Sequence, residues 1–102
     1  MAEGGGPAPV SSTALTRTVM VVNRRGLHAR AAAKFVTMAE RFGASVEVSR
    51  DGQTVSARSI MGLMMLGAAQ GAQLDLQAEG WDAKEALEAL VALVECGFDE
   101  QD

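Results

Sequence analysis

Alternating apolar and polar residues predict the strands of this chain. In QLDLQAE (residues 73–79) every second residue is apolar, and in ASVEVS (residues 44–49) two valines alternate with polar neighbours. This period of two is typical of a strand with one buried face. The segment RTVMVVN (residues 17–23) is rich in β-branched and apolar residues, which favours a strand as well. We therefore expect half-buried strands at these three places.

A spacing of three and four between apolar residues predicts a helix from His28 to about Arg41. Gly43 is expected to end it, since glycine commonly follows the last helical turn. The apolar face of this helix consists of Ala32, Phe35, Val36, Ala39 and Phe42.

Two further helices follow from their end signals. In SIMGLMMLG, Ser59 is the expected N-cap and Gly67 the expected stop. In WDAKEALEALVALVE, Asp82 and Glu85 have the spacing of a capping box, and Trp81 is expected to pack on Ala86 as a hydrophobic staple. The predicted buried stripe of this last helix is Ala83, Ala86, Leu87, Leu90, Leu93 and Val94.

The order of these elements predicts the fold class. Asp51-Gly52 is a tight-turn signal, so residues 53–57 return as the second strand of a hairpin. The resulting order, βαββαβα, predicts an α+β open-faced β-sandwich, with a four-stranded antiparallel sheet and three helices on one face. Residues 1–15 are rich in Gly, Pro, Ala and Ser and are expected to form a flexible tail, which leaves residues 16–102 as one domain.

Composition narrows the class of function. The net charge of −4 argues against general nucleic-acid binding, although arginines and a lysine gather between residues 24 and 34. No apolar run reaches the length of a membrane span, and the N-terminus lacks the regions of a signal peptide, so a cytoplasmic protein is expected. Cys96 is alone, which excludes an internal disulfide, and we expect it to be a buried, inert thiol.

The single histidine is the candidate for chemistry. At or beside the N-cap of the first helix, His28 would lie near unpaired backbone N–H groups, whose field disfavours a protonated ring and attracts anions. Arg30 adds a planar guanidinium suited to phosphate oxygens. These parts suit an imidazole that accepts and releases a phosphoryl group. A surface or capping histidine is the plainer alternative, while a metal site lacks companion ligands and a Ser-His-Asp hydrolase lacks a nucleophile elbow.

Two motifs at a characteristic spacing strengthen this interpretation. GLHARAAAKFV and SARSIMGLMMLGAAQGAQLDLQAEGWDAKEALEALVALV resemble the HPr family of phosphocarrier proteins of bacterial phosphoenolpyruvate-dependent phosphotransferase systems. The resemblance implies that His28 is phosphorylated on Nδ1 and that Arg30 contacts the phosphoryl group. It implies enzyme I as donor and enzyme IIA-type domains as acceptors, in sugar uptake or nitrogen-related regulation. It also implies a carrier that is no enzyme in itself and has no cofactor or metal.

The resemblance extends to a second site and to one departure. Ser59 matches a serine that HPr kinase/phosphorylase modifies in many bacteria, although it also serves as a plain helix cap. Ala31 stands where the family usually has proline, which is tolerated in a first helical turn. We expect phosphoryl transfer to survive this change and the local rigidity of the backbone to differ.

The resemblance also implies a docking face. The expected partner-binding residues are Arg25, Ile60, Met61, Met64 and Met65, because a short amphipathic helix leaves some of its apolar side chains outward. A monomer is expected. The alternative function is a regulatory binding module that docks on target proteins in one phosphorylation state, and a small ligand-binding domain is a further possibility.

Overall fold

The computed structural model describes residues 14–100 and contains the predicted order of elements. The strands are β1 (Leu15–Met20), β2 (Ser45–Arg50), β3 (Gln53–Ser56) and β4 (Gln73–Glu79). The helices are α2 (Ala29–Ala39), α3 (Ile60–Met65) and α4 (Ala83–Glu95), followed by the short 3-10 helix η1 (Gly97–Asp99). The α+β class is confirmed.

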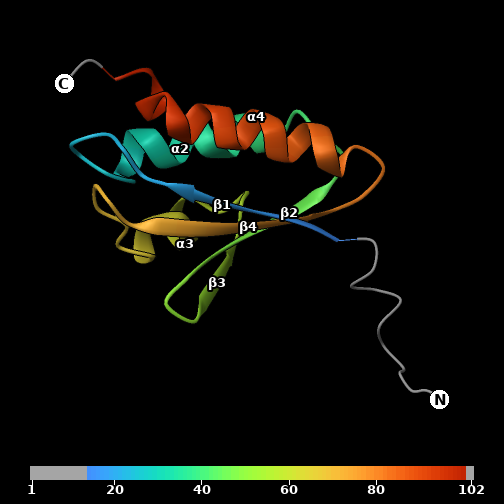
Figure 1. The fold of residues 1–102 in the computed structure, drawn as a ribbon, viewed down its shortest axis with the longest axis horizontal. Helices are drawn as coiled ribbons and strands as arrows, with labels where there is room; N and C mark the ends of the chain where they lie inside the picture. The colour runs from blue at the N-terminus through green and yellow to red at the C-terminus, as the bar shows by residue number, and fades with distance from the viewer. Residues whose placement is uncertain (1–13, 101–102) are drawn as a thin grey trace.

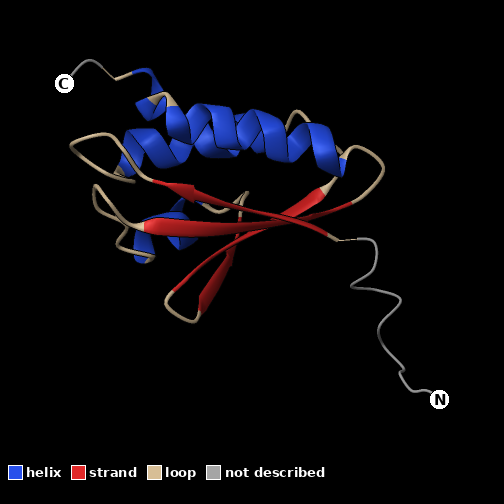
Figure 2. Cartoon of the chain, viewed as in Figure 1, coloured by secondary structure: helices blue, strands red, loops and turns tan. Residues whose placement is uncertain are grey.

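The four strands form one antiparallel sheet in the order β1-β4-β2-β3. Figures 1 and 2 show α2 and α4 lying side by side over one face of this sheet. The short helix α3 packs against α2 and β3. Side chains of all three helices join the inward residues of the strands in one core, so the open-faced sandwich is confirmed.

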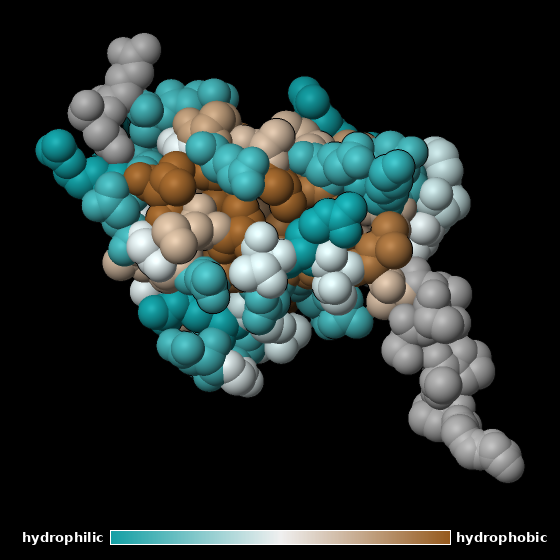
Figure 3. Space-filling model, in the orientation of Figure 1, coloured by the Kyte–Doolittle hydropathy of each residue, from teal (hydrophilic) through white to brown (hydrophobic). Residues whose placement is uncertain are grey.

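The sheet has one buried and one exposed face, as the alternation predicted. In β4, Leu74, Leu76 and Ala78 are fully buried, whereas the residues between them are exposed. On the open face, Thr18 donates a hydrogen bond to Asp75 across the β1–β4 pair. In Figure 3 apolar side chains gather in a band below the outer surface of the helices, and hydrophilic side chains flank this band on both sides.

Several element boundaries differ from the prediction. Strand β1 covers Leu15–Met20 rather than residues 17–23, and Leu15 pairs with Ala78. Leu15 therefore belongs to the sheet although it was assigned to the tail; residues 1–13 of that predicted tail lie outside the described residues. The reason is that pairing with β4 decides the strand ends, and the local sequence does not contain that information.

The end of α2 was also predicted incorrectly. The helix ends at Ala39, with Glu40 as its C-cap, two residues before Arg41. Gly43 does not have the left-handed backbone of a glycine stop; its N–H instead donates to the carboxylate of Asp82 at 2.9 Å. Phe42 lies in the turn that follows and packs against the core in part.

The start of α4 is a second correction. Asp82 occupies the N-cap position but makes no side-chain cap hydrogen bond, because its carboxylate accepts from the N–H groups of Gly43 and Ala44. The predicted capping box is therefore absent. Trp81 is 90% exposed and does not form the predicted staple with Ala86. The predicted buried stripe of α4 is confirmed in full.

Two further features concern the surface. Cys96 is exposed, contrary to the prediction of a buried thiol, since α4 ends there and its Sγ lies beside Asp99 Oδ1 at 3.3 Å. Among residues 14–100, no helix is both long and apolar enough to cross a bilayer.

Candidate phosphorylation site

His28 is the N-cap of α2, as predicted. Its backbone is extended, and its carbonyl accepts the first bond of the helix from the N–H of Ala32 at 2.8 Å. The ring nitrogen Nδ1 accepts a hydrogen bond from the backbone N–H of Arg30 at 3.3 Å. A backbone N–H can only donate, so Nδ1 holds a lone pair at the positive end of the helix.

The loop before His28 is fixed by a close backbone approach. Gly26 has a φ of +67°, and a Cβ built there would lie 2.5 Å from the carbonyl oxygen of Ala68. The next N–H, that of Leu27, donates to the same oxygen at 2.9 Å. Only glycine fits this position without strain, and the contact ties the histidine loop to the segment after α3.

The other ring nitrogen of His28 has a partner that the sequence did not reveal. Nε2 forms a hydrogen bond with Oε2 of Glu100, and the two side chains are only 16% and 12% exposed. Oε1 of Glu100 accepts from Nδ2 of Asn23 at 2.9 Å. These hydrogen bonds, from Asn23 first and then from His28, hold the pKa of Glu100 below its ordinary value. The carboxylate is therefore ionised near neutral pH.

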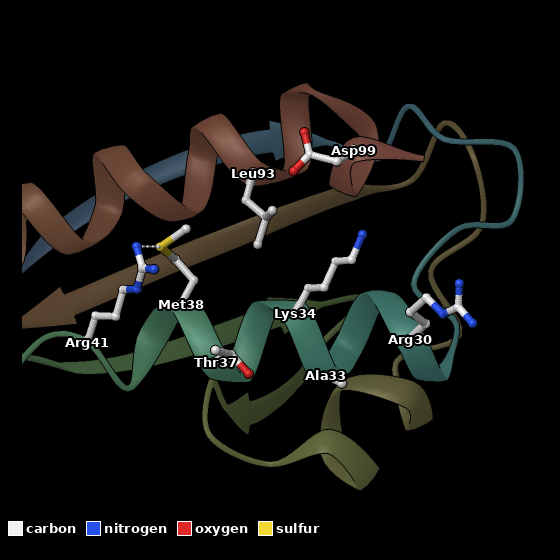
Figure 4. Close-up of a pocket in the computed structure, with 8 residues that line it drawn as sticks. All are labelled: Arg30, Ala33, Lys34, Thr37, Met38, Arg41, Leu93 and Asp99. Atoms are coloured by element: carbon white, nitrogen blue, oxygen red, sulfur yellow. Dashed lines mark hydrogen bonds between the residues drawn. The ribbon is translucent and has the colours of Figure 1, made fainter. Parts of the chain in front are cut away.

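Basic side chains continue from the histidine along α2. Arg30 is exposed at one end of a groove of about 330 Å³ between α2 and α4, and Lys34 lies one turn further on (Figure 4). Lys34 reaches across this groove and donates to the carbonyl of Phe98 at 2.6 Å. Arg25, in the loop before α2, is exposed and acts electrostatically on Glu100. The site thus combines an imidazole lone pair, a helix N-terminus and guanidinium groups, which suits a transferable phosphoryl group.

The predicted serine and methionine positions lie on and around α3. Ser59 is the N-cap of α3, where Oγ accepts from the N–H of Gly62 at 2.9 Å. Leu63 and Leu66 face the core, as predicted. The exposed apolar side chains of α3 are those of Ile60, Met61, Met64 and Met65, with Met61 at 71% and Met65 at 69%. Helix α3 packs against α2, so this surface lies on the element next to the histidine helix.

Ala31 is the third residue of α2 and is fully buried. The N–H at this position of a helix has no intrahelical partner, so the usual proline would remove no helical hydrogen bond.

Comparison with known proteins agrees with this geometry. The family model described as "PTS HPr component phosphorylation site" matches residues 15–96. The phosphocarrier protein HPr of Cupriavidus necator is 45% identical over 86 residues, which cover 84% of this chain and 97% of that protein. The phosphocarrier protein NPr of Shewanella violacea is 42% identical, over 86% of this chain and 97% of its own length. The crystal structure of an HPr from Thermoanaerobacter tengcongensis superposes with a TM-score of 0.82 at 45% identity, covering 86% of this chain and 99% of that one. The chain belongs to the HPr family.

Proposed function

We propose that this protein is a phosphocarrier of a phosphotransferase system, in which His28 takes a phosphoryl group from phospho-enzyme I and passes it to an enzyme IIA-type domain. The observation that carries the proposal is the position of Nδ1, whose lone pair faces the N-terminus of α2 beside Arg30. Membership of the HPr family, whose relatives include proteins named HPr and NPr, supports it.

The transfer uses groups that are already in place. The Nδ1 lone pair attacks phosphorus, a new N–P bond forms, and the bond from phosphorus to the donor breaks. The Arg30 N–H, which now points at the lone pair, becomes a donor to a phosphoryl oxygen, and the exposed guanidinium of Arg30 neutralises part of the oxygen charge. Attack by the acceptor reverses these steps and restores His28, so the protein acts as a stoichiometric carrier without turnover of its own.

Labelling with enzyme I and phosphoenolpyruvate tests the proposal. We expect one acid-labile, alkali-stable phosphate per chain on the wild type and none on His28→Ala. In Arg30→Ala we expect labelling to slow, since a charge-assisted contact to the phosphoryl group is lost. Wild-type protein that stays unlabelled under conditions in which a known HPr is labelled would refute the function.

The acceptor is tested in the same way. Labelled protein is mixed either with an enzyme IIA of a sugar permease or with a nitrogen-type enzyme IIA, and the rates of phosphate loss are compared. Faster transfer to one of them assigns the pathway. Transfer to neither, with His28 labelled, would restrict the protein to accepting phosphate and overturn the carrier role.

We propose further that the exposed face of α3 (Ile60, Met61, Met64 and Met65), together with Arg25, docks enzyme I and the acceptors. Flexible, polarizable methionines adapt to several partners, and a neighbouring arginine favours acidic ones. Met61→Glu should raise the Michaelis constant of enzyme I for this protein. Met20→Glu is the matched control, because Met20 is 48% exposed but points to the open face of the sheet. Equal effects of the two changes would contradict the assignment.

Ser59 is proposed as a regulatory phosphorylation site for an HPr kinase/phosphorylase. A phosphate at this N-cap would meet the N–H groups at the start of α3 and add negative charge next to the docking face. The kinase and ATP should label the wild type but not Ser59→Ala. Absence of label on the wild type would remove the claim.

We also propose that the carrier is a monomer. It would lie in the cytoplasm, where its phosphoryl donor and acceptors would meet it. Light scattering across a range of concentrations should give the mass of one chain, and cell fractionation should place the protein with enzyme I. A stable dimer mass or a membrane-bound fraction would contradict this.

A further inference from the structure

The last four described residues form a reverse turn that is anchored in the fold. Gly97 has a φ of +69°, and Phe98 and Asp99 also have left-handed backbones. Phe98 is nevertheless fully buried, so its ring fixes the turn in the core. The N–H of Glu100 donates to the carbonyl of Gly97 at 3.0 Å, and Lys34 holds the Phe98 carbonyl. The turn directs the chain from the end of α4 back to the start of α2.

This anchored turn places the Glu100 carboxylate on the histidine. One oxygen is held by the amide of Asn23, which is 3% exposed and also donates to the carbonyl of Gly26 at 2.9 Å. The other oxygen contacts Nε2 of His28. An ionised carboxylate can only accept, and Nδ1 already accepts from Arg30, so the ring proton belongs on Nε2. The arrangement selects the tautomer whose lone pair faces the helix N-terminus.

We propose that Glu100 is a positioning residue that keeps the proton on Nε2 of His28 in both the free and the phosphorylated states. The proposal rests on the proposed phosphocarrier function and adds a residue to it. The family match ends at residue 96, so Glu100 lies beyond the segment that the family model describes.

The retained proton matters because of the charge balance of the transfer. When Nδ1 bonds to phosphorus, the ring keeps its Nε2–H and becomes positively charged. An anion in contact with that N–H stabilises the charge. When the acceptor attacks phosphorus, the N–P electron pair returns to Nδ1, and the leaving group is a neutral imidazole. If Nε2 had lost its proton, the leaving group would be an imidazolate, which leaves far more slowly.

Charged groups of both signs lie near this contact, and Asp99, an exposed carboxylate next to Glu100, lines the same groove as Arg30 and Lys34. Arg25 lies near Glu100, Arg30 follows the histidine on α2, and Lys34 lies one turn further. Helix α3 carries no titratable side chain. The three cations disfavour a positive ring and Asp99 favours it, but Glu100 is the carboxylate that contacts Nε2 directly.

Nuclear magnetic resonance of the unphosphorylated protein tests the contact. In the wild type at neutral pH we expect a slowly exchanging ¹H–¹⁵N correlation at Nε2 and an unprotonated ¹⁵N shift at Nδ1. Glu100→Ala should lose the Nε2 correlation to fast exchange, whereas Glu95→Gln, at an exposed carboxylate of α4, should keep it. Absence of the correlation in the wild type, or its persistence in Glu100→Ala, would overturn the inference. This experiment does not depend on enzyme I.

The phosphorylated protein tests the consequence. The pH midpoint of the ³¹P shift of phosphohistidine should fall by about one unit in both Glu100→Ala and Glu100→Gln. Above both midpoints, hydrolysis and transfer to the acceptor should slow by about tenfold, because one unit changes the protonated fraction tenfold. Glu95→Gln should match the wild type.

The glutamine variant separates charge from structure. Its single amide oxygen can accept from Nε2–H only at the expense of the Asn23 hydrogen bond, so a purely structural role of the Nε2 contact predicts rescue of both the midpoint and the rates. Such a rescue, or unchanged midpoints in both Glu100 variants, would refute the proposal. Failure of enzyme I to label the wild type would instead refute the phosphocarrier function.

Discussion

Replacing Asp82 by alanine tests how the start of α4 is held to the rest of the fold. Asp82 is 6% exposed, and its two carboxylate oxygens accept from the N–H groups of Gly43 and Ala44 at 2.9 and 2.8 Å. Hydrogen bonds to a charged group contribute about 1.5 to 3 kcal/mol each. The Asp82→Ala protein should therefore lose at least about 3 kcal/mol of its free energy of unfolding. A loss of that size lowers the melting temperature of a domain of this length by about 12 °C or more.

The matched variant is Glu85→Ala. If Asp82 and Glu85 formed a capping box, this change would destabilise the fold to an extent comparable with Asp82→Ala. Since Asp82 makes no cap hydrogen bond in the structure, this box is absent, and the change should cost less than about 0.5 kcal/mol. Urea denaturation followed by circular dichroism gives both values from the shift of the midpoint at constant slope. If Asp82→Ala costs only about 1 kcal/mol, the value of an ordinary N-cap, or if the two variants are equally destabilised, the structural reasoning is wrong.

Two further predictions follow from the loop before α2. Asn23→Ala should raise the pKa of Glu100, because the Asn23 hydrogen bond is the largest cause of its depression; ¹³C carboxyl shifts measure this, and an unchanged midpoint would contradict it. Because the pKa of Glu100 is lower in the folded protein, its carboxylate stabilises the fold above the ordinary glutamate value of about 4.5, and this stabilisation is lost as pH falls through the depressed pKa. Acid unfolding of Asn23→Ala should therefore begin at higher pH. Gly26→Ala should lower the free energy of unfolding by about 3 kcal/mol, because alanine is strained in the left-handed region and its Cβ would clash with the carbonyl of Ala68. Urea denaturation measures this loss. Gly52→Ala is the control, since its φ is +85° but a Cβ there meets open space, and an equal cost would show that the clash contributes nothing.

The sequence was sufficient where local period and end signals decide the structure. The buried positions of β4 and α4 follow from side-chain geometry along a strand or helix. The caps Ser59 and His28 were found for the same reason, since a helix start depends on the adjacent residues. Prediction failed at Gly43 and Asp82, which look like local signals but bind each other across 39 residues. The Asp82 carboxylate that a capping box requires is hydrogen-bonded to the distant N–H groups of Gly43 and Ala44 instead.

The sequence also did not predict which residue contacts Nε2 of His28. Glu100 contacts a histidine 72 residues away, and no motif links the two. The contact exists because Phe98 is buried although its backbone is left-handed, which nothing in the spacing of apolar residues indicates. Cys96 was misjudged for a related reason: free cysteines are usually buried, but this one lies where α4 ends at the surface. Tertiary contacts decide all three positions.

The close approach of Gly26 to Ala68 has a consequence for how partners discriminate. It joins the loop that carries His28 to the segment that leaves α3, so the backbone positions of these two segments are coupled. In the docking we propose, a partner therefore meets the histidine and the exposed methionines on linked backbone segments. Selectivity among the proposed donor and acceptors would then come mainly from side-chain rotamers, for which methionine is well suited.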